Sequence, residues 1–174
     1  VRRDGGSRWR YPNLWDDCVG AWSPSQQSLG GLTLFDRSGK QNHGTLTNMD
    51  PATDWVSTEG GLLDFDGTAN NFVDVGSPTD LGFASGQNFA VSCFFYARSF
   101  SGQAQIIYKG DHVDDVPLYL LRLHTTGGGK VIWELRGTTQ RDELIGSQVI
   151  STNQWYHVYA DWKDGTSRIY INGQ

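Results

Sequence analysis

One short segment concentrates the oxygen-bearing groups that a hard cation requires. Residues 36 to 45 include Asp36, Asn42 and Thr45, with glycines at 39 and 44 that permit a tight turn. Calcium takes six to eight oxygens from carboxylates, amides and main-chain carbonyls. We therefore predict a partial calcium site whose ligands are Asp36, Asn42, Thr45 and the carbonyls around Gly44. The alternative is a metal-free turn, in which Asp36 and Asn42 hydrogen-bond to the loop backbone.

The histidines and cysteines form no metal or nucleophile motif. No paired His or Cys spacing predicts zinc, and no Gly-x-Ser-x-Gly elbow accompanies a serine. His157 alternates with apolar residues, which favours a structural, hydrogen-bonded histidine. Cys18 and Cys93 lie in apolar runs, and we expect buried free thiols, with one disulfide as the alternative.

The elements that position these residues are predicted to be strands. The 174-residue chain has 22 glycines and 22 aromatic residues, but only three glutamates and four lysines. Helix formers are therefore scarce, whereas strand and turn formers are common. This length suits one domain with its own core. The composition predicts an all-β protein.

Short strands are predicted along the whole chain. Alternation at 44–48 indicates a half-buried strand, and the apolar run at 89–97 indicates a strand buried on both faces. Glycines at 127–129 favour a hairpin connection. Further strands are expected at 105–110, 118–123, 130–136, 155–162 and 168–173. Many short strands at this spacing indicate a sandwich or jelly roll.

Five motifs in this order resemble the laminin G-like jelly roll of the concanavalin A-like lectin and glucanase superfamily. They are the Asp-x-Ser-Gly-x-x-Asn-x-Gly-Thr turn at 36–45 followed by Phe-Asp-Gly at 65–67, Phe-Ala-Val-Ser-Cys-Phe at 89–94, Ile-Ile-Tyr-Lys-Gly at 106–110, Gln-Trp-Tyr-His-Val at 154–158, and Arg-Ile-Tyr-Ile-Asn-Gly at 168–173. The resemblance implies an antiparallel β-sandwich over residues 14–174, preceded by a basic arm at 1–13.

The resemblance also implies strands beyond the sequence. Members of the family usually continue past the Asn-Gly turn with a Gly-x-Ile-Asp-x-Val-Arg strand that completes a sheet and supplies an acidic metal ligand. Because the sequence ends at Gln174, we expect a jelly roll that lacks its C-terminal strands, with completion by a neighbouring chain as the alternative.

The superfamily includes glucanases, which hydrolyse glycosidic bonds. Their carboxylates lie on one strand in patterns such as Glu-x-Asp-x-x-Glu, and they flank the scissile bond. The glutamates here are Glu59, Glu134 and Glu143, and none has that spacing. We therefore expect a protein that is not an enzyme, and a glycoside hydrolase or lyase is the least favoured interpretation.

Carbohydrate binding is predicted from aromatic and polar side chains outside the clearest strands. Sugar sites combine aromatic faces with polar groups that fix the hydroxyls. Trp55 lies outside the clearest strands, and the loop at 109–115 is polar and acidic. The predicted ligand contacts are Trp55, Asp111, His112 and Asp114, although core packing and a solvated loop explain the same residues.

The charge distribution bears on partners. Four arginines give residues 1–10 a net charge of +3, whereas the rest of the chain carries −8. Such an arm is typical of a solvated tail or of docking to an acidic partner. The body has no basic stripe for nucleic acid and no apolar run of the ~20 residues that span a membrane.

These observations predict a non-catalytic, lectin-like recognition or structural module. Resemblance to proteins of bacteriophages and environmental bacteria favours a virion surface component of decoration or fibre type, which binds glycans and contacts capsid or other virion proteins through the arm. The alternative is an extracellular or cell-surface bacterial module that binds carbohydrate. Assembly into a homo-oligomer is left open.

Overall fold

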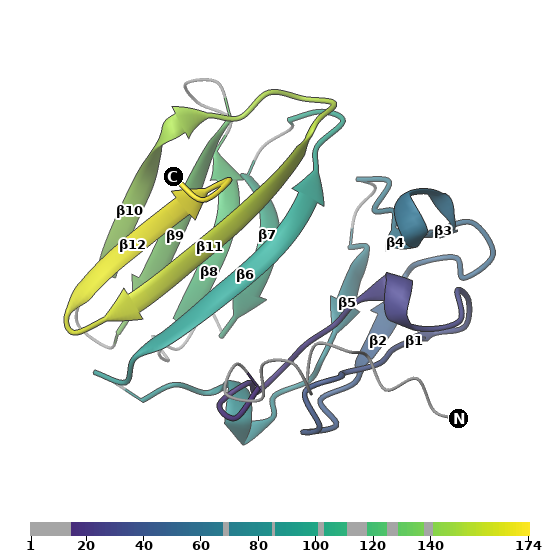
Figure 1. Ribbon diagram of the computed structural model, residues 1–174, viewed down its shortest axis with the longest axis horizontal. Helices are drawn as coiled ribbons and strands as arrows, with labels where there is room; N and C mark the ends of the chain where they lie inside the picture. Colours follow the sequence, from purple (N-terminus) through teal and green to yellow (C-terminus); the bar gives the residue numbers. More distant parts are fainter. Residues whose placement is uncertain are drawn as a thin grey trace. The chain divides into compact units, whose positions relative to one another are not determined.

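The computed structural model describes residues 15–67, 70–84, 86–100, 103–110, 118–124, 129–137 and 141–174. The chain divides into two compact units, one ending at Gly82 and the other beginning at Phe83, where the sequence predicts one domain from residue 14. The predicted basic arm at 1–13 lies outside the described residues. Strands dominate both units, and the helical segments are single short turns (Figure 1).

The first unit is built from short strands. Its three-stranded antiparallel sheet has the order β1-β2-β5, formed by β1 (Thr33–Leu34), β2 (Gly44–Thr47) and β5 (Phe72–Asp74). A separate hairpin joins β3 (Trp55–Val56) to β4 (Leu62–Leu63). The 3-10 turns are η2 (Pro24–Gln26), η3 (Thr58–Gly60) and η4 (Thr79–Leu81). A small core forms from Leu34, Leu46, Met49 and Trp55.

The second unit is an antiparallel sandwich of two sheets. One sheet has the order β10-β9-β8-β7 and the other the order β12-β11-β6. The strands are β6 (Phe89–Tyr96), β7 (Gln103–Lys109), β8 (Leu118–His124), β9 (Lys130–Arg136), β10 (Arg141–Val149), β11 (Trp155–Lys163) and β12 (Thr166–Ile171). This architecture confirms the predicted all-β sandwich class.

The core of the second unit lies between the two sheets. Alternate residues of each strand point inward because successive side chains leave opposite faces of a strand. Leu121, Val131, Trp133 and Val158 are completely enclosed there. The sequence predicts β6 to be buried on both faces, but only one face packs against this core. The other face carries Phe94, whose exposed fraction is 72%.

Candidate functional site

The Asp36 turn is held together by the chain's own hydrogen-bond donors. Oδ1 of Asp36 accepts hydrogen bonds from the backbone N–H groups of Ala21 and Ser38, both at 2.8 Å. Oδ2 accepts from the Ser38 hydroxyl at 2.7 Å and from the Asn42 N–H at 3.0 Å. Burial alone would raise the pKa of Asp36, but the hydrogen bonds from Ser38, Ala21 and Asn42 outweigh it and lower the pKa. The carboxylate is therefore ionised and fully engaged.

The other predicted calcium ligands have structural partners or face solvent. The Asn42 side-chain amide donates to the carbonyl of Val19 at 2.9 Å. Gly44 lies where an added Cβ would come within 2.3 Å of the Val73 side chain, so close packing explains this glycine. Thr45 is exposed on β2. Within the described ranges, no group of three or more His, Cys, Asp or Glu residues is placed to hold a metal.

These contacts favour the metal-free turn over a cation site. A calcium ion would have to displace donors that already occupy both oxygens of Asp36, and each displaced donor would lose a charge-assisted hydrogen bond. The calcium site of Asp36, Asn42, Gly44 and Thr45 stays a prediction.

Of the predicted ligand contacts, the structure describes only Trp55. Trp55 is buried in the core of the first unit, with 8% of its surface exposed, and its Nε1 donates to the carbonyl of Gly31 at 2.9 Å. This placement favours a packing role, because an enclosed ring offers no face for a sugar to stack on. Asp111, His112 and Asp114 lie outside the described residues.

A network of arginines and glutamates occupies the outer face of the four-stranded sheet. It consists of Arg122 on β8, Glu134 and Arg136 on β9, and Arg141 and Glu143 on β10. Nη2 of Arg122 donates to Glu134 at 3.2 Å and to Glu143 at 3.0 Å. Arg136 and Arg141 also donate to Glu134, and Arg141 donates to Glu143. We call these five residues the Arg–Glu network.

The Arg–Glu network is buried at its centre and open at one side. Glu134 is fully buried and Arg122 is 4% exposed. The side chains of Arg141 and Glu143 are 49% and 30% exposed. Burial would raise the pKa of Glu134, but Arg136 and Arg141 outweigh it and lower the pKa. The hydrogen bond to Glu134 raises the pKa of Arg141. Both groups therefore keep their charges.

Strand register brings this network together. Glu143 is the direct cross-strand partner of Glu134, because β9 and β10 are adjacent antiparallel strands. Both glutamates are evident in the sequence, but no strand is predicted at 141–149, and so their pairing is not predicted. One sequence feature could have predicted it. Charged residues stand at positions 134 and 136 and again at 141 and 143, and alternate positions of a strand lie on one face.

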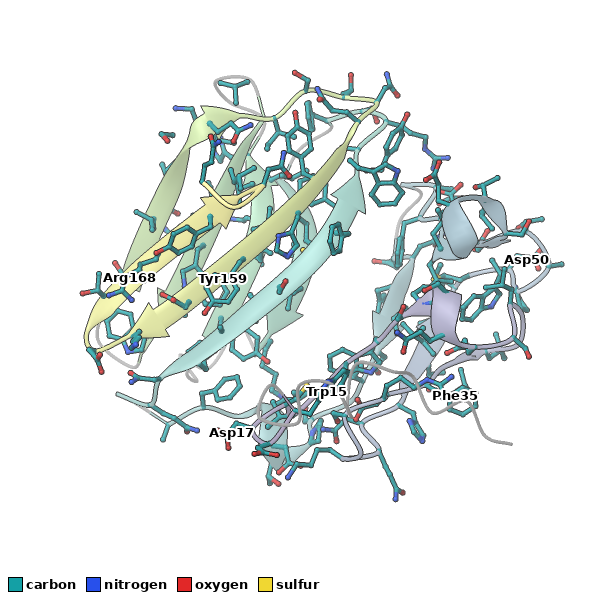
Figure 2. All side chains as sticks on the ribbon, in the orientation of Figure 1. Trp15, Asp17, Phe35, Asp50, Tyr159 and Arg168 are labelled. Carbon is teal, nitrogen blue, oxygen red and sulfur yellow. The ribbon has the colours of Figure 1, made fainter. Side chains whose placement is uncertain are left out.

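The outer face of the second unit's three-stranded sheet, β12-β11-β6, carries aromatic side chains in cross-strand pairs. Tyr96 and Trp155 have ring centroids 5.5 Å apart, and those of Phe94 and His157 are 4.6 Å apart. His157 Nε2 also lies 2.8 Å from the Ser92 hydroxyl, as expected for a structural histidine. Figure 2 shows Tyr159 and Arg168 on β11 and β12 of the same sheet.

The two cysteines are free thiols. Cys93 is on the inner face of β6 beside the core, and burial raises the pKa of its thiol to about 12. Cys18 is half-buried, and its Sγ lies 3.5 Å from the carbonyl of Gly20. An activated nucleophile requires a lowered pKa, so Cys93 is not arranged as one.

Comparison with known proteins gives one result. The family model of the concanavalin A-like lectin/glucanases superfamily matches residues 66–174. That range contains the whole second unit and the end of the first, and it begins after the Asp36 turn. No curated protein and no solved structure matches the chain. None of the helices in the described ranges has the length and apolar character needed to cross a bilayer.

Proposed function

Because the chain belongs to the concanavalin A-like lectin/glucanase superfamily, we propose that it is a non-catalytic module that binds glycans at the Arg–Glu network. The observation that carries this proposal is a charged network whose buried centre fixes the positions of two partly exposed groups, Arg141 and Glu143. Fold alone does not assign a ligand, whereas the chemistry of these groups indicates one.

Sugar hydroxyls both donate and accept hydrogen bonds, and the network offers both partners side by side. The Arg141 guanidinium donates, and the Glu143 carboxylate accepts. Hydrogen bonds to charged groups are shorter and stronger than neutral ones. Arg122 and Glu134 hold the two exposed groups before the ligand arrives. Such preorganisation reduces the entropy lost on binding.

The same charges argue against hydrolysis. A glycosidase needs one carboxylic acid with a raised pKa to protonate the leaving oxygen, beside a second carboxylate. The arginines lower the pKa of Glu134, and Glu143 shares Arg122 and Arg141 with it. Glu134 is therefore not suited to donate a proton near neutral pH, which supports a binding role.

The test compares binding by the wild type with binding by Arg141→Gln and Glu143→Gln on a glycan array. Binding should fall for both variants, whereas Lys163→Gln, an exposed change on β11 outside the network, should bind as the wild type does. Melting temperatures would check that each variant folds. Unchanged binding by the folded Arg141 and Glu143 variants would place the ligand elsewhere, and absence of any glycan binding would overturn the function. Release of reducing ends from bound glycans would show an enzyme.

A virion surface is the setting that we propose, with an extracellular or bacterial cell-surface position as the alternative. Support comes from the basic arm, whose four arginines could dock to acidic virion proteins. Mass spectrometry of purified particles should detect this chain. Its consistent absence would favour the cell-surface alternative.

A further inference from the structure

An open groove lies beside the Arg–Glu network, between β10 and the turn that joins β11 to β12. Residues 141–144 of β10 form one wall, and Trp162, Gly165, Thr166 and Ser167 form the other. Its volume of about 630 Å³ falls within the usual range of ligand sites. Because Arg141 and Glu143 belong to both the groove and the network, the two surfaces are continuous.

Trp162 is the aromatic residue of this groove. It is half-exposed near the end of β11. The residues packed into the core of the second unit do not include it, and among the described residues no ring contact involves it. The other tryptophan of β11, Trp155, contacts Tyr96 on the outer face instead. An indole that faces a groove without a ring partner can stack on the apolar face of a sugar.

Polar groups surround the indole on both walls. The Ser167 hydroxyl donates to Oδ2 of Asp142 at 2.5 Å, which links β12 to β10 across the groove. Thr166 is exposed beside it. The groove therefore combines an aromatic ring, a carboxylate, hydroxyls and the guanidinium of Arg141, a set that matches the alternating apolar and hydroxyl faces of a saccharide.

We infer that this groove is a second sugar subsite, so that the ligand is an oligosaccharide chain rather than a single sugar. One unit binds at the Arg–Glu network, and the next unit lies over Trp162, with Arg141 contacting both. This inference rests on the proposed function, since the first subsite is the network itself. It adds the class of the ligand, an oligosaccharide, and the direction in which the saccharide extends, from the outer face of the four-stranded sheet towards β12.

The test measures affinity against chain length, with gluco-, manno- and chito-oligosaccharides from the monosaccharide to the hexasaccharide as probes. Wild-type affinity should rise from the monosaccharide to longer chains. Trp162→Ala should lower oligosaccharide affinity by about tenfold, near the upper limit for one aromatic contact, and leave monosaccharide affinity unchanged. Trp155→Ala is the matched control, a tryptophan of the same strand on the other face, and should bind every length as the wild type does.

A second variant protects the test against misfolding. Thr166→Val removes one hydroxyl from an exposed turn position with little change in shape, and it should weaken oligosaccharide binding only. Wild-type affinity that does not depend on chain length, or folded Trp162→Ala and Thr166→Val variants with wild-type affinity for long chains, would overturn the second subsite while the network proposal stands. Loss of binding in Trp155→Ala would place the chain on the aromatic face. Absence of binding by the wild type to every probe would overturn both proposals.

Discussion

Replacing Glu134 by glutamine should cost the second unit a large part of its stability. Glu134 is fully buried and contacts Arg122, Arg136 and Arg141. Glutamine keeps the shape but removes the charge, which leaves Arg122 buried with weaker compensation. Breaking a buried ion pair from one side typically costs ~3 to 5 kcal/mol. Because Glu143 still contacts Arg122 and Arg141, we expect the lower end, about 3 kcal/mol.

The assay is urea and thermal unfolding at neutral pH. A loss of about 3 kcal/mol corresponds to a drop of more than roughly 10 °C in melting temperature for a unit of this size. Arg122→Met combined with Glu134→Leu should be less destabilising than Glu134→Gln alone, because the central buried pair is then removed from both sides. A Glu134→Gln variant within about 0.5 kcal/mol of the wild type, the usual range for surface changes, would refute the reasoning.

The same variant has a defined pH dependence. The folded pKa of Glu134 is lowered, so its contribution is fully present above the unfolded pKa of about 4.3. That contribution is lost as the pH falls through the lower folded value, because the unfolded state then binds more protons. The stability gap between wild type and Glu134→Gln should therefore shrink below about pH 4. A gap that stays constant down to pH 2 would mean that the charge of Glu134 is not its cause.

Two further predictions concern the Asp36 turn and the cysteines. Asp36→Ala should destabilise the first unit by about 3 kcal/mol, because three backbone N–H donors and the Ser38 hydroxyl would lose a charged acceptor. For a metal-free turn, calcium titration of the wild type should leave its melting temperature unchanged, and a calcium-dependent rise would support the predicted cation site instead. Cys93, with its pKa raised to about 12, should resist thiol reagents at pH 8 in the folded protein and react only on unfolding. Mass spectrometry measures the extent of labelling, and rapid labelling of Cys93 would show that the core opens.

The sequence identifies most of the second unit because its central strands alternate or are continuously apolar. The expected strands at 105–110, 130–136 and 155–162 correspond to β7, β9 and β11. The strand β10 was not expected, since residues 141–149 are mostly polar and mostly exposed. This edge strand forms because its backbone hydrogen-bonds to β9, and its sequence shows no alternation of apolar and polar residues that would predict a strand.

Side-chain partnerships were harder to predict than strands. The Arg–Glu network depends on the register between β9 and β10, and the polar sequence of β10 specifies that register only weakly. Trp55 belongs to a small core assembled from residues scattered between 34 and 55, so its burial has no local signature. The apolar run of β6 does not reflect burial on both faces. On its outer face, Phe94 contacts His157 and Tyr96 contacts Trp155, both on the neighbouring strand β11.

The position of β6 in its sheet sets an order for assembly during synthesis. Phe89 pairs with Trp162 and Tyr96 with Trp155, while β7 to β10 follow one another in the intervening chain as a meander (Figure 1). Neighbouring strands can join by short loop closures, whereas β6 meets β11 only after all four of them have left the ribosome. Until then, the backbone N–H and C=O groups of β6 have no strand to pair with among the described residues, because β11 is the strand beside β6 in its sheet. The pairing of β6 with β11 is therefore the step at which folding competes with aggregation.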